Sequence, residues 1–289
     1  MASVSLLCFF ASYLVALVVE VARWKWDHAA LRWGGWAAIA AGLTAQTIYL
    51  AVRSRSVEMM PLLASPHDWL LGLAWLLVAT LVVLARFLPQ IALGSYLLPP
   101  AIGIIAVAWF VDADPKADPL RENGGWVLAH SLILVLGFVG VILAFVSSLM
   151  YLRQHRRLKR REPLASGARL LDLETLARWN WWAVMGAAPL ITIGFAMGAA
   201  LSLASDQAAA AVPLRSMPMV LMAVLWLGLV GLMVWLLTQP RAGGTAVAVR
   251  TAWACGFVLL IVLSLTLLGP DAGLHGMPAP SAVATGDAA

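Results

Sequence analysis

The stretch WVLAHSLILVLGFVGVILAFVSSLMYLRQHRRLKRR, from Trp126 to Arg161, decides the fold class of this chain. Residues 126–152 carry no Asp, Glu, Lys or Arg, and a dense basic run follows them. About 20 apolar residues span the hydrocarbon core of a bilayer. Lipid offers no partner to backbone N–H and C=O groups, so such a span has to be helical. The stretch therefore predicts a transmembrane helix with a basic anchor at its cytoplasmic end.

Seven further apolar stretches of similar length surround this one. Of the 289 residues, 62% are hydrophobic and 11% are charged, whereas a soluble domain carries roughly 25% charged residues. The chain is therefore predicted to be an all-α, polytopic membrane helix bundle, forming a single domain over 1–275 with a disordered tail at 276–289. We place the spans at about 5–22, 35–52, 68–85, 91–111, 126–152, 181–203, 217–238 and 251–269.

The basic residues predict the orientation of the bundle. Fourteen of the 19 Lys and Arg residues fall in the loops after the first, third, fifth and seventh spans. Because such residues are retained in the cytoplasm, we expect both termini outside and a multi-pass protein of the bacterial inner (plasma) membrane. The net charge of +5 is thereby explained without nucleic acid as a partner. Membrane lipid is the expected partner, and the basic run at 153–162 has the composition that binds anionic head groups.

Few residues in the spans suit chemistry. No span has a central charged residue, which argues against an ion-coupled carrier, and Glu20 is expected to reach the inner interface. Cys8 and Cys255 form no Cys-x-x-Cys pair, so neither a redox motif nor a haem attachment site is predicted. No nucleophile–base pair or phosphate loop is visible, which argues against a self-contained catalyst. The segment 163–180 predicts a short amphipathic helix on the cytoplasmic surface.

Three histidines fall on the predicted outer side although they are far apart in the chain. His67 precedes the third span, His130 lies one turn into the fifth, and His275 follows the eighth. Imidazole is the usual axial ligand of haem iron, and two imidazoles can hold the iron from opposite faces. The alternative is that each is a tolerated polar residue at a membrane interface. The pattern makes His130 and His275 candidate haem-iron ligands, with His67 as a weaker candidate.

At these residues the chain resembles a known family, over about Gly125 to Gly276. The stretch from Trp126 to Arg161, where a histidine begins a helix that ends in Tyr-Leu and a basic run, is similar to the cytochrome c assembly family of CcsA/ResC-type membrane proteins and their HemX-like relatives. GPDAGLHG, from Gly269 to Gly276, resembles the closing Gly-Leu-His-Ser-Tyr of that family. Between these, LETLARWNWWAVMGAAPLITIGFAMGAAL matches a family segment at Gly186, Pro189, Leu190, Thr192, Gly194 and Gly198.

The resemblance implies that the protein handles haem near the outer membrane surface. In such proteins two outward histidines ligate the iron, and His130 and His275 match their positions. The implied cofactor is a transiently held haem b. The implied partners are haem, a cytochrome c maturation membrane partner and apocytochrome c. The chain departs from the family in three respects. The tryptophan-rich motif expected between the sixth and seventh spans is missing from Ala204 to Pro218. The seventh span ends in Thr238-Gln239-Pro240-Arg241, where the family often has a histidine before the arginine, and Gly276 replaces the usual serine.

Three functions stay open from the sequence. The first is a haem-handling factor that presents haem for c-type cytochrome assembly on the outer side. The second is a HemX-like, non-catalytic accessory or regulator of haem biosynthesis, which the missing tryptophan-rich motif favours. The third is a carrier of a small apolar molecule, which the prolines Pro99 and Pro100 of the fourth span would permit.

Overall fold

The computed structural model describes residues 5–23, 25–26, 28–57, 65–88, 93–111, 113, 124–160, 172–204, 217–238 and 244–268. Within these ranges the chain forms eight α-helices and no strand, which confirms the predicted all-α bundle. The helices are α1 (Leu6–Ala22), α2 (Ala29–Val57), α4 (Pro66–Phe87), α5 (Gly94–Ala108), α6 (Gly124–Lys159), α7 (Leu173–Ala204), α8 (Met217–Thr238) and α9 (Gly244–Leu268). The predicted tail at 276–289 and His275 lie outside the described residues.

Six of the described helices are long and apolar enough to cross a membrane, namely α2, α4, α6, α7, α8 and α9. α1 and α5 are also apolar but have 17 and 15 residues, which at ~1.5 Å per residue reach about 25 and 22 Å. Large apolar side chains such as Val83, Leu227 and Trp253 are exposed along the helices, as lipid permits and water does not. The chain is a multi-pass membrane protein. Its orientation stays a prediction.

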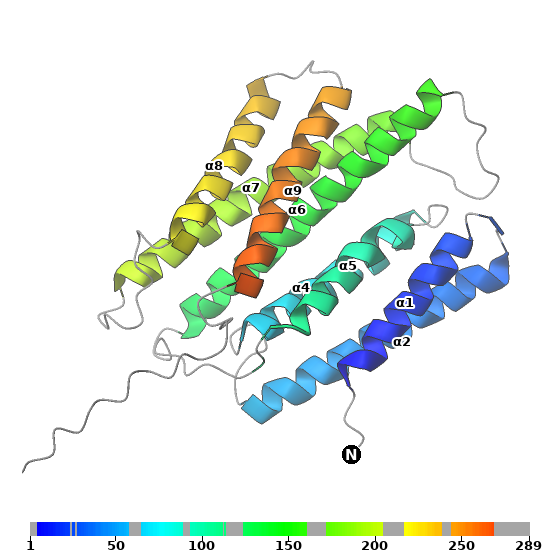
Figure 1. Ribbon diagram of the computed structural model, residues 1–289, viewed down its shortest axis with the longest axis horizontal. Helices are drawn as coiled ribbons and strands as arrows, with labels where there is room; N and C mark the ends of the chain where they lie inside the picture. The colour runs from blue at the N-terminus through cyan, green and yellow to red at the C-terminus, as the bar shows by residue number, and fades with distance from the viewer. Residues whose placement is uncertain are drawn as a thin grey trace, which may run out of the picture.

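The eight helices form two groups of four (Figure 1). α1, α2, α4 and α5 pack together, α6, α7, α8 and α9 pack together, and α6 joins the groups by packing against α4 and α5. Successive helices are antiparallel, so α1, α4, α6 and α8 begin at the end of the bundle where α2, α5, α7 and α9 finish. We call this the lower end, after its place in Figure 1, and the opposite one the upper end. With 36 residues, α6 is about 54 Å long and exceeds the ~30 Å hydrocarbon core.

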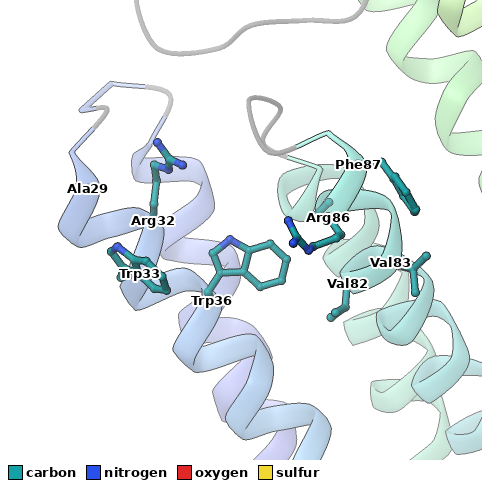
Figure 2. A pocket seen from close by; sticks show the side chains of 9 residues that line it. Ala29, Arg32, Trp33, Trp36, Val82, Val83, Arg86 and Phe87 are labelled. Atoms are coloured by element: carbon teal, nitrogen blue, oxygen red, sulfur yellow. The ribbon is translucent and has the colours of Figure 1, made fainter.

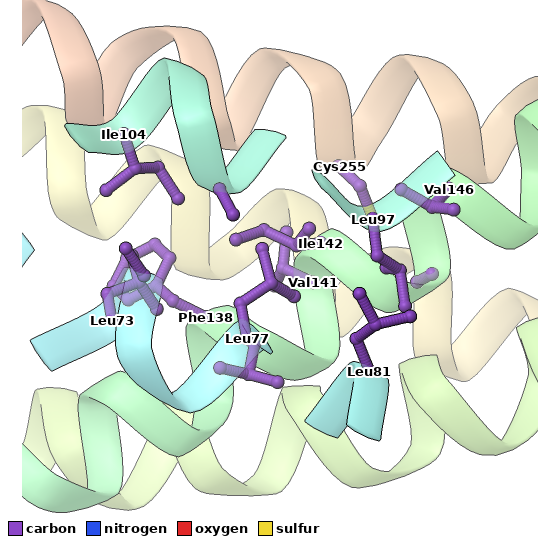
Figure 3. Close-up of a cluster of buried hydrophobic side chains, with 14 of the residues drawn as sticks. Leu73, Leu77, Leu81, Leu97, Ile104, Phe138, Val141, Ile142, Val146 and Cys255 are labelled. Atoms are coloured by element: carbon purple, nitrogen blue, oxygen red, sulfur yellow. The ribbon is translucent and has the colours of Figure 1, made fainter. Parts of the chain in front are cut away.

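Aliphatic side chains fill the space where the two groups meet (Figure 3). Leu73, Leu77 and Leu81 recur every four residues on α4 and therefore share one face of that helix. All three are buried, and they pack beside Phe138 and Ile142 of α6. Since lipid tails are as apolar as leucine, this interface is held by close packing rather than by exclusion of water.

Buried hydrogen bonds tie helices together within the first group. The Tyr13 hydroxyl donates to Gln46 Oε1 over 2.7 Å, and Gln46 Nε2 donates to the Leu71 carbonyl over 3.0 Å. These bonds link α1, α2 and α4. In membranes an interhelical hydrogen bond contributes about 0.6 kcal/mol on average. These bonds therefore stabilise the bundle modestly, and they also set the register between the three helices.

The expected amphipathic helix at 163–180 is described only over its last residues, which belong to α7 and not to a separate helix. Residues 163–171 lie outside the described part of the chain. Leu173 to Asn180 form the first two turns of α7, which runs unbroken to Ala204. The Thr175 amide donates to the Asp172 carboxylate over 3.0 Å and so caps the helix start. Asn180 is buried, and its side-chain amide is satisfied by two hydrogen bonds. It accepts from Ser148 of α6 at 3.2 Å and donates to Thr251 of α9 at 3.3 Å.

Glu20, which the sequence predicted to reach the inner interface, is buried among the helices. It is 4% exposed, and Arg23 Nη1 donates to its Oε1 over 2.6 Å. A partner three residues along the same helix face holds the carboxylate inside the bundle, where it lies against Gly94 of α5.

Candidate functional site

His130 lies in the second turn of α6, at the lower end of the bundle. Its Nδ1–H donates to the carbonyl of Gly194 on α7 over 2.8 Å. In a neutral imidazole one nitrogen donates and the other carries a lone pair. The bond to Gly194 therefore assigns the proton to Nδ1 and leaves Nε2 as the acceptor, which is the tautomer that metal-ligating histidines adopt.

Two glycines of α7 form the surface against which His130 packs. A Cβ placed on Gly198 would lie 2.8 Å from His130 Cε1, and one on Gly194 would lie 2.5 Å from Leu134 Cδ2. His130 and Leu134 are four residues apart and so share a face of α6. The Gly-x-x-x-Gly pattern at 194–198 lets two helices approach closely in a membrane, and here the histidine ring occupies part of that contact.

The α7 surface beside this contact is aromatic. Phe195 stacks on Trp226 of α8 with ring centroids 5.5 Å apart and an interplanar angle of 10°. Trp226 Nε1 donates to Thr192 Oγ1 over 2.9 Å. Thr192 belongs to the segment that resembles the cytochrome c assembly family, whereas nothing in the sequence singled out Trp226. The lower half of α7 thus connects His130 to a stacked aromatic pair that joins α7 to α8.

His67 lies at the same end of the bundle in a different environment. It is buried at the start of α4, with Nδ1 2.7 Å from the Ala108 carbonyl and Nε2 3.5 Å from the Tyr49 hydroxyl. The carbonyl can only accept, so Nδ1 carries the proton and Nε2 faces the hydroxyl. Both ring nitrogens are therefore directed at protein groups, and His67 links α4 to α5 and α2.

The two histidines are offset along the bundle axis. Trp69 of α4 and Phe138 of α6 meet edge to face with centroids 5.5 Å apart, so these positions mark one level on two helices that run in the same direction. His67 precedes Trp69 by two residues, whereas His130 precedes Phe138 by eight. At ~1.5 Å per residue, His130 lies about 9 Å nearer the lower end of the bundle than His67, measured along the helices.

A buried ion pair lies beside His67 and was not predicted. Asp68 is fully buried and accepts from Arg53 Nε, while Ser65 Oγ donates to its second oxygen over 3.0 Å. Arg53 also donates to the carbonyl of Ala113. Two signals were available: Ser65-x-x-Asp68 before an apolar run is a helix-capping pattern, and Arg53 is a cation on the predicted outer side.

His275 lies outside the described residues, so the structure does not place it relative to His130. α9, the helix that precedes it, packs against α6 and ends at the lower end, where α6 begins (Figure 1). Within the part of the chain that is described, no three His, Cys, Asp or Glu side chains gather as a metal site would require. A haem iron needs only two protein ligands.

The part of the chain that holds His67 and His130 resembles a known protein family. The model of the cytochrome C assembly protein family matches residues 65–202. This range holds α4, α5, α6 and nearly all of α7. It therefore includes His67 and His130, and also Gly194 and Gly198, the two glycines against which His130 and its helix pack. It begins at residue 65, so the family similarity extends into the first 120 residues, beyond the stretch from Gly125 that the sequence motifs indicated. No curated protein and no solved structure matches the chain.

Proposed function

We propose that the protein handles haem at the outer side of the bacterial inner membrane. The match of residues 65–202 to the cytochrome C assembly protein family supports a role in c-type cytochrome biogenesis. In this proposal haem b is cargo, held transiently and presented for attachment to apocytochrome c. His130 Nε2 is one axial ligand of the iron and His275 is the other. A membrane partner of cytochrome c maturation receives the haem from this end of the bundle.

The observation that carries the proposal is the fixed tautomer of His130. A ligating imidazole has to be neutral at the nitrogen that meets the iron, and the 2.8 Å bond from Nδ1 to the Gly194 carbonyl leaves the lone pair on Nε2. Such a second bond also orients the ring. The ring is partly exposed rather than enclosed, so a flat ligand can approach it from outside the helix contact.

The surroundings of His130 suit a porphyrin. Trp126, one turn earlier on α6, is 64% exposed, and Leu132 is 43% exposed. Exposed apolar side chains at the lower end provide a surface for the macrocycle, as ligand sites in helix bundles commonly do. His275 follows Leu268 by seven positions, a length that reaches at most about 25 Å. This span supports the pairing of His275 with His130 at the lower end.

A HemX-like accessory is the second candidate, because the tryptophan-rich motif is missing from Ala204 to Pro218. Such a protein would regulate haem biosynthesis or stabilise other membrane proteins without ligating haem. A carrier of a small apolar molecule has no observation of its own among the described residues.

A gene deletion with complementation separates these functions. We expect the deletion to lower covalently bound haem in c-type cytochromes, measured by haem-stained gels of membranes. His130→Ala should behave like the deletion. His155→Ala should restore the cytochromes, because His155 lies on the same helix at the upper end, stacked on Tyr151. Full restoration by His130→Ala at equal protein level would refute ligation. Normal c-type cytochromes in the deletion, with altered levels of haem-synthesis proteins, would select the accessory.

A further inference from the structure

A groove lies between the first turns of α2 and the last turns of α4, at the upper end of the bundle (Figure 2). Its volume is about 720 Å³, within the range of small-molecule sites. Val83 and Phe87 line it and are 56% and 77% exposed, so the groove opens sideways between the helices rather than into the core. In a membrane protein a lateral opening of this kind faces lipid.

The charged side chains that line the described part of the groove are all positive. Arg32 of α2 and Arg86 of α4 line it, and no acidic residue does so among its described lining. Glu20 belongs to a small adjoining cavity that shares Trp36 and Ala85 with the groove, and it is already paired with Arg23. In the described part of the chain neither Arg32 nor Arg86 makes an ion pair. The groove therefore presents two cations with no counter-charge among the residues that the structure describes.

The polar and apolar parts of the groove are ordered along the bundle. Trp36 lies one helical turn deeper than Arg32 on α2, and Val82 lies one turn deeper than Arg86 on α4. Figure 2 shows the Trp36 indole reaching from α2 toward the Arg86 side chain. Along each helix the arginine therefore starts about 5–6 Å nearer the upper end than Trp36 or Val82 does.

We propose that this groove binds one anionic phospholipid. The two arginines hold the negatively charged head group, and one acyl chain runs along Trp36 and Val82. Arginine is suited to phosphate because its planar fork donates two parallel hydrogen bonds. Tryptophan suits the same level of the membrane, where one edge of its ring is apolar and the other meets head groups. This site is independent of haem and lies at the opposite end of the bundle from His130.

Native mass spectrometry of the lipid-depleted, full-length protein tests this site. The probes are phosphatidylglycerol and phosphatidylcholine with identical acyl chains. We expect a one-to-one adduct that favours phosphatidylglycerol roughly tenfold, because each arginine near a head group favours an anionic lipid by a fewfold. R32Q/R86Q should reduce this preference below about threefold. R156Q/R160Q removes the same charge at the end of α6 and should keep it.

Each contrary result overturns the proposal. Equal binding of the two lipids by the unaltered protein would show that the groove does not select charge. A preference retained in R32Q/R86Q, or lost only in R156Q/R160Q, would place the anion site on the basic run of α6. Displacement of the lipid by an equal concentration of glycerol phosphate would show a site for a free anion. Val83→Trp fills the groove, and unchanged lipid binding in that variant would exclude the acyl-chain path.

Discussion

Gly198→Ala tests whether the contact between α6 and α7 positions His130. The added Cβ would lie 2.8 Å from His130 Cε1, whereas carbon atoms in contact are ordinarily about 3.5–4.0 Å apart. The ring therefore has to move by about 1 Å, or the helices have to separate. Either change stretches the 2.8 Å bond from Nδ1 to the Gly194 carbonyl to about 3.5 Å or more, where a hydrogen bond is effectively lost.

Three contributions set the size of the effect on stability. The lost interhelical hydrogen bond costs about 0.6–1 kcal/mol, and overpacking costs about 1–3 kcal/mol. Alanine is favoured over glycine in a helix by about 1 kcal/mol, which offsets part of the loss. We expect the free energy of unfolding to fall by about 1–3 kcal/mol.

Gly186→Ala is the matched control on the same helix. A Cβ at Gly186 would meet nothing within 4 Å, so we expect no loss of stability and a gain of up to about 1 kcal/mol. Unfolding midpoints in detergent micelles, titrated with sodium dodecyl sulfate, compare the two variants. If Gly198→Ala is as stable as Gly186→Ala, the close packing of His130 on α7 is not present in the membrane-extracted protein.

Three further outcomes follow from buried or capped polar groups. Asp68→Ala breaks a buried ion pair near the lower end by removing its carboxylate and should lower the free energy of unfolding by about 3 kcal/mol, while Glu174→Ala, at an exposed pair, should change it by less than about 0.5 kcal/mol; equal effects would contradict the buried pair. Asn180→Ala removes two interhelical hydrogen bonds and should cost about 1 kcal/mol in the same assay, an expectation that an unchanged midpoint would refute. Hydrogen bonds from Thr175 hold the pKa of Asp172 below its usual value. Its cap therefore stabilises α7 above the unfolded pKa of about 3.9, and the benefit is lost as pH falls through the lower folded value; a difference between the unaltered protein and Asp172→Ala that persists below that pH would contradict this.

The sequence predicted the helices because lipid imposes a simple rule. Any long apolar run has to satisfy its backbone internally, so each of the eight predicted spans overlaps one helix. Helix boundaries followed less well, since hydropathy marks where lipid begins and not where helix begins. Leu173 to Asn180 are polar enough to lie at a surface, yet a capping carboxylate at Asp172 starts α7 there, ahead of its apolar part.

The partners of the site residues could not be predicted. His130 was identifiable from its position in the span, but its acceptor Gly194 is 64 residues away and is fixed only by how α6 and α7 pack. The same holds for Arg53 and Asp68, whose pairing depends on α2 and α4 meeting at the lower end. His67 was a weaker candidate than His130 in the sequence, and the structure distinguishes the two by the groups that face their ring nitrogens.

The visible absorption spectrum of the purified protein, loaded with haem, tests the role of His130 most directly. The unaltered protein should give the sharp, low-spin bands of an iron held by two imidazoles. His130→Ala and His275→Ala should each lose those bands, and His155→Ala should keep them. A low-spin spectrum that is unchanged in His130→Ala would contradict ligation through the Nε2 atom that the bond to Gly194 leaves free.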